Sequence, residues 1–292
     1  MPPHPEFITQ IDAMHTRAEA WRRASKRIGL VPTMGALHRG HFSLIEACQR
    51  ASDLTVVSIF VNPMQFGPRE DYTIYPRDLD SDLSQLARLG VEAVFHPQAE
   101  SMYPSDFATI VEVEGLSDTL CGPFRPGHFR GVTTVVTKLF NAVKPHLAVF
   151  GQKDYQQAQI IRRMIRDLSL DIDVLVAPTI RQNDGLALSS RNANLTPEEI
   201  QQSPLLYKAL EQGAAMIAGG EKDAAKVSAY IRGIIEREVT DRIDYVSIVD
   251  PDDLSLIEQI QGPVVIALAV HVSRTRLIDN IKVDLRSNPG SI

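Results

Sequence analysis

The chain has 292 residues, of which 44% are apolar and 23% are charged, a composition typical of globular proteins. A chain of this length is expected to form roughly two domains of about 100 to 200 residues, with a core that needs no disulfide scaffold. The net charge of −6 gives no general attraction to nucleic acid or to an anionic membrane, so an anionic ligand needs a local binding site.

The first half of the chain alternates short β-branched runs with amphipathic stretches, which is the pattern of βαβ units on a parallel sheet. In chain order, it predicts helix 8–25, strand 28–31, helix 42–51, strand 54–61, helix 79–89, strand 91–95, helix 132–143, strand 147–150, helix 156–168 and strand 172–177. Apolar side chains recur at helical spacing between Ile160 and Leu168, and this helix face is expected to pack on the sheet.

The second part of the chain begins after Asn183-Asp184-Gly185, a sequence typical of a turn. Thr196 and Glu199 have the spacing of a helix N-cap and its reciprocal partner, with Pro197 at the first helical position. Helices are then predicted at 197–217 and 222–238, followed by strands at 243–249, 264–270 and 277–283. Helices followed by strands predict a separate α+β domain, with a boundary between residues 183 and 196.

Neither export nor membrane insertion is expected. The chain has two cysteines, Cys48 and Cys121, without CxxC spacing, which argues against a disulfide-rich secreted module and a cysteine-rich zinc site. The longest apolar run, 264–270, is far shorter than the ~20 residues that cross a bilayer. The first ten residues lack the basic start and the apolar stretch of a signal peptide. We therefore expect a cytoplasmic protein with no membrane or nucleic-acid partner.

The first candidate for chemistry is the segment 32–41, PTMGALHRGH, in which a strand ends in a glycine-containing loop that opens into a helix. Ligands of α/β sheets bind beyond the carboxyl ends of the strands, where a helix N-terminus offers N–H groups to phosphate. His38 and His41 are expected at that phosphate position. Taken alone, they are also consistent with turn and capping residues or with metal ligands, although a zinc hydrolase needs a third ligand and the motif has no HExxH frame.

The second candidate is the segment 188–192, LSSRN, which follows the predicted turn. Two hydroxyls beside a guanidinium suit the phosphates of a nucleotide, because arginine supplies a planar fork of donors. A plain polar loop is the alternative. Together, the two segments resemble the HIGH and KMSKS pair of the adenylyl-transferring superfamily, whose members activate carboxylates or phosphates by attack on the α-phosphorus of ATP.

Gln65 lies in the segment 60–66, FVNPMQF, after a predicted strand. Its amide both donates and accepts hydrogen bonds without charge, which suits a hydroxy acid as the ligand. An acid-rich stretch follows. Its carboxylates either help to hold a hydrated Mg²⁺ ion or form a solvent-exposed face of the protein. Its members are Glu70, Asp71, Asp78, Asp80 and Asp82.

Two further segments are candidates for contact with phosphate. The segment 121–131, CGPFRPGHFRG, is too rich in glycine and proline for regular structure, and its basic residues favour an anion-facing loop. In the segment 150–157, FGQKDYQQ, Gly151 lets a nucleotide approach the backbone and Lys153 reaches phosphate. Asp154 and Gln157 are also consistent with a helix N-cap and its reciprocal partner.

The ordered set MGALHRGH, FVNPMQF, EDYTIYPRD, CGPFRPGHFRGV, TKLF, FGQKDYQQ and DGLALSSRN spans residues 34–192 and resembles the pantothenate synthetase family, the pantoate:beta-alanine ligases. The resemblance implies an α/β fold with a Rossmann-like N-terminal domain, residues 1–186, and a smaller α+β C-terminal lid domain, residues 187–292. It also implies a homodimer. The implied reaction is the ATP-dependent condensation of (R)-pantoate with β-alanine through a pantoyl adenylate, with release of pyrophosphate and AMP, in pantothenate and coenzyme A biosynthesis.

The resemblance also implies which residues form the site, with Mg²⁺ bridging phosphate oxygens. The expected catalytic residues are His38, His41, Lys153, Ser189 and Arg191, with His41 as the hydrogen-bond or proton donor. The residues expected to bind ATP are Met34, Gly35, Ala36, Leu37, His38, Arg39, Gly40, His41, Gly151, Gln152, Lys153, Asp154, Ile180, Leu188, Ser189, Ser190 and Arg191. Gln65 and Gln157 are expected to hold pantoate, and Gln65 also β-alanine. Family members can carry a run of acids where this chain has Asp80-Ser81-Asp82, and here Asp82 and Gln85 are the expected metal ligands.

Three other functions compete with this interpretation. A nucleotidylyltransferase of the same superfamily attacks ATP with a phosphate ester and needs more cationic residues around its acceptor than Gln65 and Gln157. A nucleotide-sensing module keeps the fold without turnover, although the histidines, Lys153 and Arg191 are all present. A generic α/β domain requires seven ordered segments to be turns and caps by coincidence. We therefore expect a ligase that activates pantoate.

Overall fold

The computed structural model describes residues 4–68, 70, 72–240 and 242–284, which form two compact units. The first unit consists of Met1–Ser117, Arg125–Gln152 and Ile160–Pro178, and the second of Asp118–Phe124, Lys153–Gln159 and Thr179–Ile292. The division into domains between residues 186 and 187 stays a prediction.

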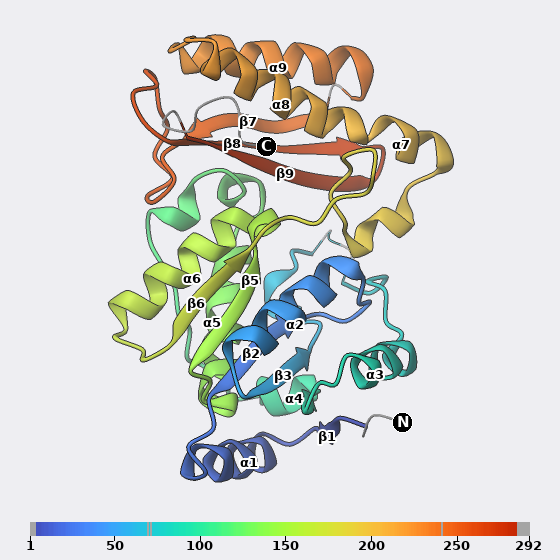
Figure 1. Ribbon diagram of the computed structural model, residues 1–292, viewed down its shortest axis with the longest axis vertical. Helices are drawn as coiled ribbons and strands as arrows, with labels where there is room; N and C mark the ends of the chain where they lie inside the picture. The colour runs from blue at the N-terminus through green and yellow to red at the C-terminus, as the bar shows by residue number, and fades with distance from the viewer. Residues whose placement is uncertain (1–3, 69, 71, 241, 285–292) are drawn as a thin grey trace. The chain divides into compact units, whose positions relative to one another are not determined.

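The first unit is built on a parallel sheet of six strands in the order β1-β4-β3-β2-β5-β6 (Figure 1). The strands are β1 (Glu6–Ile8), β2 (Ile28–Thr33), β3 (Leu54–Ile59), β4 (Ala93–Phe95), β5 (Leu147–Gly151) and β6 (Asp173–Ala177). The strand order reverses between β2 and β5, because the chain runs outward from β2 to β4 on one side and from β5 to β6 on the other. Ligands of such sheets bind beyond the carboxyl ends of the strands at this reversal point. The predicted parallel α/β sheet is therefore confirmed, and β2 leads directly into the first histidine motif.

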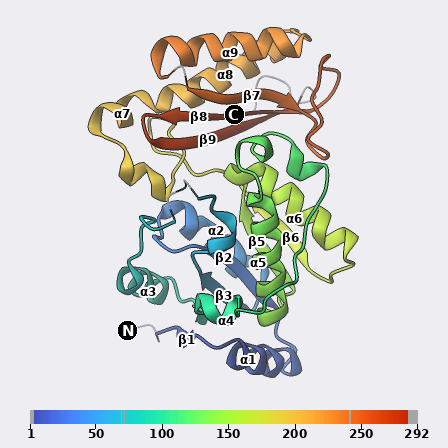
Figure 2. The ribbon, with the colours of Figure 1, turned by 180° about the vertical axis from the view of Figure 1, so that it is seen from behind.

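Helices cover both faces of this sheet. Helices α2 (Arg39–Ala51) and α3 (Leu79–Arg88) pack on one face, where Ile45, Val57 and Leu86 are fully buried. The opposite face carries α5 (His128–Val143), as the view from behind shows (Figure 2), and α1 (Ile11–Arg23) packs against α5. The chain also forms α4 (Ala99–Met102) and α6 (Tyr155–Asp167), whose Met164 accepts a hydrogen bond from the Thr137 hydroxyl of α5 at 3.2 Å.

The second unit contains an antiparallel sheet of three strands, β7 (Ile243–Val249), β8 (Val264–Val272) and β9 (Thr275–Val283). Helices α8 (Pro204–Ala218) and α9 (Ala224–Glu238) pack on this sheet and bury Leu210, Val227 and Ile231 completely. The predicted helix-then-strand order of a small α+β unit is confirmed. None of the described helices is long and apolar enough to cross a membrane.

The helix predicted at 197–217 is wrong as a single element. It divides into α7 (Pro197–Gln202) and α8 at Ser203, because Pro204 starts a new helix at its first position. The predicted capping box is confirmed: the N–H of Glu199 donates to the Thr196 hydroxyl at 3.3 Å, and the N–H of Thr196 donates to the Glu199 carboxylate at 2.8 Å.

Two predictions for the first unit also need correction. The predicted helix 8–25 is shorter, because β1 takes Glu6–Ile8 as an edge strand beside β4 and α1 begins at Ile11. The predicted loop 121–131 ends earlier, since α5 begins at His128 after Gly127, whose φ is +79°. A helix can start there because glycine adopts this left-handed conformation without steric cost.

Candidate active site

Both histidines of the first motif cap the start of α2. His38 is the N-cap residue, and its Nδ1 accepts the N–H of Gly40 at 3.1 Å. Nδ1 of His41 accepts the N–H of His38 at 3.3 Å. A ring nitrogen that accepts a hydrogen bond carries no hydrogen, so a neutral imidazole in this position has its hydrogen on Nε2. The capping interpretation is confirmed, and the same contacts fix both rings as Nε2–H donors at the positive end of a helix, with centroids 4.1 Å apart.

The histidine loop, defined as residues 34–38, is held by a buried carboxylate from α3. Asp82 is 2% exposed, and its two oxygens accept the N–H groups of Ala36 and Leu37 at 2.9 and 2.8 Å. These bonds stabilise a backbone that L residues rarely adopt, with φ of +83° at Gly35 and +50° at Ala36. Burial raises the pKa of Asp82 and outweighs the two N–H groups, which lower it. Asp82 therefore holds the backbone that leads into His38.

Asp82 and Gln85, the residues expected to bind Mg²⁺, do not fit a metal site as they are placed. Both oxygens of Asp82 accept backbone N–H groups, and the Gln85 amide donates to Oγ and the carbonyl oxygen of Ser81 at 3.2 and 3.3 Å. Among the residues that the structure describes, no three His, Cys, Asp or Glu side chains are grouped to hold a metal ion. Elsewhere in the acidic stretch, Asp78 caps α3 by accepting the N–H of Ser81 at 3.1 Å, while Asp71 lies outside the described residues.

The Asp82→Asn variant separates loop support from metal binding. An amide keeps one acceptor oxygen but turns donors toward one of the two loop N–H groups, so the free energy of unfolding is expected to fall by roughly 1 to 3 kcal/mol. The Mg²⁺ concentration for half-maximal activity is expected to stay at the wild-type value. Gln85→Leu is the control and is expected to change neither quantity. A raised Mg²⁺ requirement in both variants, with unchanged stability, would instead support metal binding.

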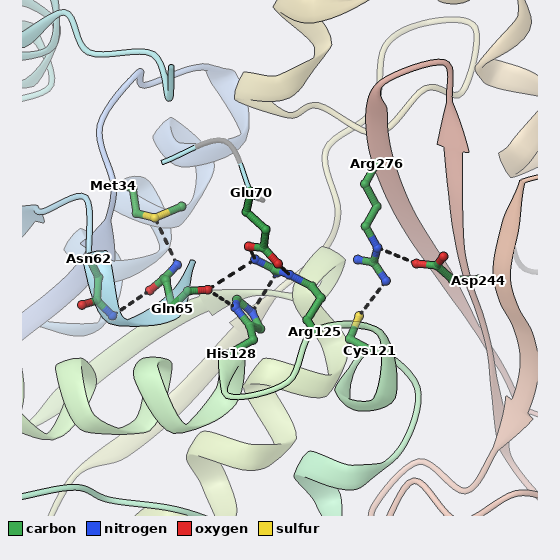
Figure 3. A network of polar contacts seen from close by, with 9 residues as sticks. All are labelled: Met34, Asn62, Gln65, Glu70, Cys121, Arg125, His128, Asp244 and Arg276. Atoms are coloured by element: carbon green, nitrogen blue, oxygen red, sulfur yellow. Dashed lines mark hydrogen bonds and ion pairs between the residues drawn. The ribbon is translucent and has the colours of Figure 1, made fainter. Parts of the chain in front are cut away.

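The side-chain amide of Gln65 is oriented by hydrogen bonds at both of its ends (Figure 3). Oε1 accepts Nδ2 of Asn62 at 3.1 Å, and Nε2 donates to Sδ of Met34 at 3.1 Å. Asn62 is 1% exposed, accepts the hydroxyl of Tyr103 at 2.7 Å and donates to the carbonyl oxygen of Gly131 at 3.1 Å. The residue expected to hold pantoate is thus joined to the histidine loop, with its amide direction set by a buried neighbour.

Arg125 and His128 hold the backbone of the same turn (Figure 3). Nδ1 of His128 lies 2.8 Å from the carbonyl oxygen of Gln65, so Nδ1 donates and Nε2 accepts from Arg125 at 3.0 Å. Arg125 also donates to both carboxylate oxygens of Glu70 at 2.8 and 2.5 Å. Burial raises the pKa of Glu70, but the hydrogen bond and charge of Arg125 outweigh it and hold this pKa below its usual value. The anion that this arginine faces in the structure is the Glu70 carboxylate.

The Glu70→Gln variant is expected to lose stability in a pH-dependent way. At neutral pH, loss of the charged hydrogen bonds to Arg125 is expected to lower the free energy of unfolding by about 1.5 to 3 kcal/mol. Since the folded-state pKa lies below the usual 4.5, the wild-type advantage is complete above that pH and shrinks as the pH falls through the lowered value. Denaturant unfolding of both proteins between pH 3 and 7 measures this difference. Glu6→Gln, which breaks an exposed pair with Arg17, should change stability by less than about 1 kcal/mol, and an equal loss in both variants would contradict the prediction.

The carboxyl end of β5 lies at the same edge of the sheet as the histidine loop, since β5 pairs in parallel with β2. Gly151 ends β5, and Gln152, Lys153 and Asp154 form the 3-10 turn η4 (Gln152–Asp154). Among the residues that the structure describes, a Cβ at Gly151 would meet only the Leu44 side chain within 4 Å, at 3.9 Å, so packing against these residues does not require a glycine there. Gln157 lies half-buried in the first turn of α6, and its pairing with Asp154 as a cap stays a prediction.

In the second unit, the segment LSSRN is a capped turn. The carbonyl oxygen of Ile180 accepts the N–H of Leu188 at 3.0 Å, so the chain folds back as a short hairpin before the segment begins. Ser189 then caps the 3-10 turn η5 (Ser190–Asn194), with its hydroxyl accepting the N–H of Arg191 at 3.3 Å. Ser190 and Arg191 are half-buried. Local hydrogen bonds therefore fix the backbone that carries the two serine hydroxyls and the arginine guanidinium.

Sequence reasoning missed the residues that hold these segments in place. In the second unit, the buried amide of Gln156 accepts the N–H of Cys121 at 3.0 Å and donates to the carbonyl oxygen of Thr119 at 2.7 Å. Arg276 donates to Asp244 at 2.7 Å and contacts the Cys121 sulfur at 3.5 Å (Figure 3). The adjacent glutamines of FGQKDYQQ give a signal that one amide is structural, but their spacing does not tell which of the two is buried.

Known proteins resemble this chain over almost its whole length. A family model described as pantoate-beta-alanine ligase matches residues 6–282. A pantothenate synthetase of Moorella thermoacetica is 52% identical, covering 96% of this chain and 99% of the relative, and one of Thermotoga neapolitana is 51% identical, covering 94% and 98%. The crystal structure of pantothenate synthetase from Thermus thermophilus superposes with a TM-score of 0.89 at 42% identity, covering 94% of this chain and 98% of that one. The ligase of Francisella tularensis, complexed with beta-gamma ATP and β-alanine, superposes with a TM-score of 0.78 at 32% identity, covering 98% and 99%. The chain belongs to the pantoate–β-alanine ligase family.

Proposed function

We propose that the protein condenses (R)-pantoate with β-alanine in an ATP-dependent reaction that yields pantothenate, AMP and pyrophosphate. The observation that carries this proposal is the capped histidine motif. Two Nε2–H donors and the N-terminus of α2 follow β2 at the reversal point of a parallel sheet, where phosphate binds in this architecture. Membership of a family named for this ligation supplies the identity of the two substrates.

The first step joins the carboxylate of pantoate to ATP. A carboxylate oxygen attacks the α-phosphorus, the bond from that phosphorus to the pyrophosphate oxygen breaks, and pantoyl adenylate forms. Because a carboxylate is already a nucleophile, the protein has to align two anions and stabilise the charge that builds on pyrophosphate. We assign this work to His38, His41, Lys153 and the segment Ser189–Arg191, with His41 as the hydrogen-bond or proton donor. In the second step, the amine of β-alanine attacks the acyl carbon, AMP leaves and the nitrogen loses a proton.

The substrates are held by amides and by backbone. Gln65 and Gln157 hold pantoate, whose hydroxyl and carboxylate oxygens suit a group that both donates and accepts, and Gln65 also contacts β-alanine. The contacts of Gln65 with Asn62 and Met34 support this assignment, because a fixed amide loses little freedom when a substrate binds. ATP lies along Met34–His41 and Gly151–Asp154, with Ile180 near the adenine and Leu188 beside the serine and arginine donors.

In this proposal, Mg²⁺ binds to the protein together with ATP. Magnesium ions commonly keep several waters and bind substrate phosphates with only one or two protein carboxylates, so the lack of fit at Asp82 and Gln85 is compatible with a metal that ATP carries. When bound, the ion neutralises charge on phosphate oxygens.

We further propose that the protein is a cytoplasmic homodimer. Closed two-fold dimers are the commonest soluble assembly, and the family resemblance favours one. Both cysteines are free thiols, which suits a reducing compartment. Sedimentation at micromolar concentration is expected to show a species of twice the chain mass of 32.4 kDa, and a species at the chain mass alone would overturn the dimer.

Identification of the products tests the proposed function. Purified protein is incubated with ATP, Mg²⁺, pantoate and β-alanine, and the expected products are pantothenate, AMP and pyrophosphate in equal amounts. Release of ADP and orthophosphate would exclude adenylyl transfer. ATP binding without any turnover would instead support a nucleotide-sensing module.

A further inference from the structure

Two adjacent polar residues of β9, Asp279 and Asn280, are buried in the second unit. Asp279 is 6% exposed and Asn280 is 3% exposed. A buried carboxylate and a buried amide are costly unless each finds hydrogen-bond partners, and an apolar pair would serve the sheet equally well. The partners of these two side chains therefore indicate what the pair does.

Asp279 binds the start of the hairpin that leads into LSSRN. Its carboxylate accepts two hydrogen bonds from Arg181, at 2.6 and 2.8 Å, in the bidentate geometry that makes such pairs strong and directional. Arg181 also donates to the carbonyl oxygen of Gly185 at 3.1 Å and lies over the ring of Tyr207, 3.6 Å from its centroid. One guanidinium thus ties the first arm and the turn of the hairpin to β9, a few residues before Ser189.

Asn280 binds the turn that carries Lys153. Its Nδ2 donates to the carbonyl oxygen of Lys153 at 3.0 Å, so the side chain fixes the backbone of the lysine and leaves the ammonium group to act elsewhere. The N–H of Asn280 donates to the Asp279 carboxylate at 2.8 Å, which couples the two neighbours. A single strand therefore contacts the turn of Lys153 directly, and it holds the hairpin that leads into Ser189–Arg191 through Arg181.

We propose that Asp279 and Asn280 are positioning residues that set the two phosphate-binding segments, Ser189–Arg191 and Lys153, in register with each other. The inference rests on the proposed function for the role of these segments, but its structural part does not. Asp279 acts through Arg181 on the hairpin 180–188, and Asn280 acts directly on the turn 152–154. Neither side chain is assigned a contact with the reacting atoms.

Amide hydrogen exchange on the full-length protein without ligand tests the structural part. In Asn280→Asp, a side chain of nearly the same shape loses its donor, so exchange is expected to speed up about tenfold or more in peptides that cover 151–157. In Asp279→Asn, the same acceleration is expected in peptides that cover 181–192. Ser203→Ala is the matched control, because Ser203 is also buried and donates one hydrogen bond to a carbonyl oxygen, that of Glu199 at 2.7 Å. Unchanged exchange in both β9 variants would overturn the proposal.

Kinetics then distinguish positioning from a general structural role. Both β9 variants are expected to raise the KM for ATP or lower kcat by about tenfold, while the KM for pantoate stays near the wild-type value. Ser203→Ala is expected to lower Tm without a change in these constants. β9 variants that lower Tm but keep wild-type constants would show the pair to be structural. If Asn280→Asp does not fold, Asn280→Ala is measured in its place.

The two failures remain distinguishable. If the wild-type protein binds no ATP and forms no pantothenate, the proposed function fails, whereas the exchange experiment still decides whether β9 sets the two segments. If the wild-type protein is active and the variants exchange and react as it does, the proposed function stands and the positioning role is wrong.

Discussion

The His41→Ala variant is expected to lose a factor of 10² to 10³ in kcat, about 2.7 to 4 kcal/mol of barrier, which is typical for removal of one preorganised donor. The structure gives the reason. Nδ1 of His41 accepts the N–H of His38, and the hydrogen on Nε2 is therefore directed by a contact that exists before ATP binds. Steady-state rates at saturating ATP, pantoate and β-alanine measure the effect. Because the variant also loses a cap, a stability loss of ~0.5 to 2 kcal/mol is expected alongside.

A second histidine provides the control for the capping effect. Nδ1 of His146 accepts the N–H of Ile28 at 3.0 Å, a contact of the same kind at the opposite end of β2. The His146→Ala variant is expected to lower Tm by a similar amount and to keep kcat within about twofold of wild type. If His41→Ala loses stability and keeps normal kcat, as this control does, then its role is capping alone.

Replacement of Gly131 by alanine is expected to cause the largest loss of stability. A Cβ at Gly131 would lie 2.3 Å from the carbonyl oxygen of Met64 and 2.6 Å from the backbone nitrogen of Gln65. Since backbone cannot move aside as a flexible side chain can, we expect a loss of roughly 3 kcal/mol or more, at the upper end of overpacking costs. For a chain of this size, Tm should fall by about 6 °C or more. The turn that carries Gln65 must also shift, so the KM for pantoate is expected to rise.

The matched control is Gly233→Ala in the middle of α9. A Cβ there meets none of the described residues within 4 Å, so the same change should raise stability by about 0.5 to 1 kcal/mol through helix propensity. The two variants are thus expected to differ in sign, which thermal melting of both reveals. A Gly131→Ala protein as stable as wild type would mean that the contact between α5 and the turn at Gln65 is looser than the structure shows.

The fold was largely predictable because its strands and helices follow local patterns. The β-branched runs at 28–31, 54–61 and 147–150 became β2, β3 and β5, and the helical spacing of 79–89 became α3. The start of α5 was missed because glycine commonly marks turns and loops, and Gly127 and Gly131 were therefore assigned to a loop. In this protein, Gly127 is the N-cap residue of α5 in a left-handed conformation, and Gly131 lets α5 approach the backbone of Met64 and Gln65. Only the packed structure specifies these two roles.

Those parts of the candidate site that lie in one short motif could be predicted from the sequence. Contacts between segments far apart in the chain could not. The spacing of His38 and His41 is local, and so both the phosphate interpretation and the capping interpretation could be read from the sequence. The contact of Asp82 with Ala36 joins residues 46 positions apart, and that of Arg125 with Glu70 joins residues 55 apart. No periodic pattern encodes such pairs, and the sequence therefore predicted neither contact.

We expect the protein to form pantoyl adenylate before β-alanine reacts. Exchange of labelled pyrophosphate into ATP tests it directly, because the label enters ATP only if the first step runs backward on the enzyme. We expect exchange that requires pantoate and Mg²⁺, proceeds without β-alanine and falls by about 10² or more in His41→Ala. Exchange that strictly requires β-alanine, or that proceeds equally without pantoate, would rule out a pantoyl adenylate formed before β-alanine reacts.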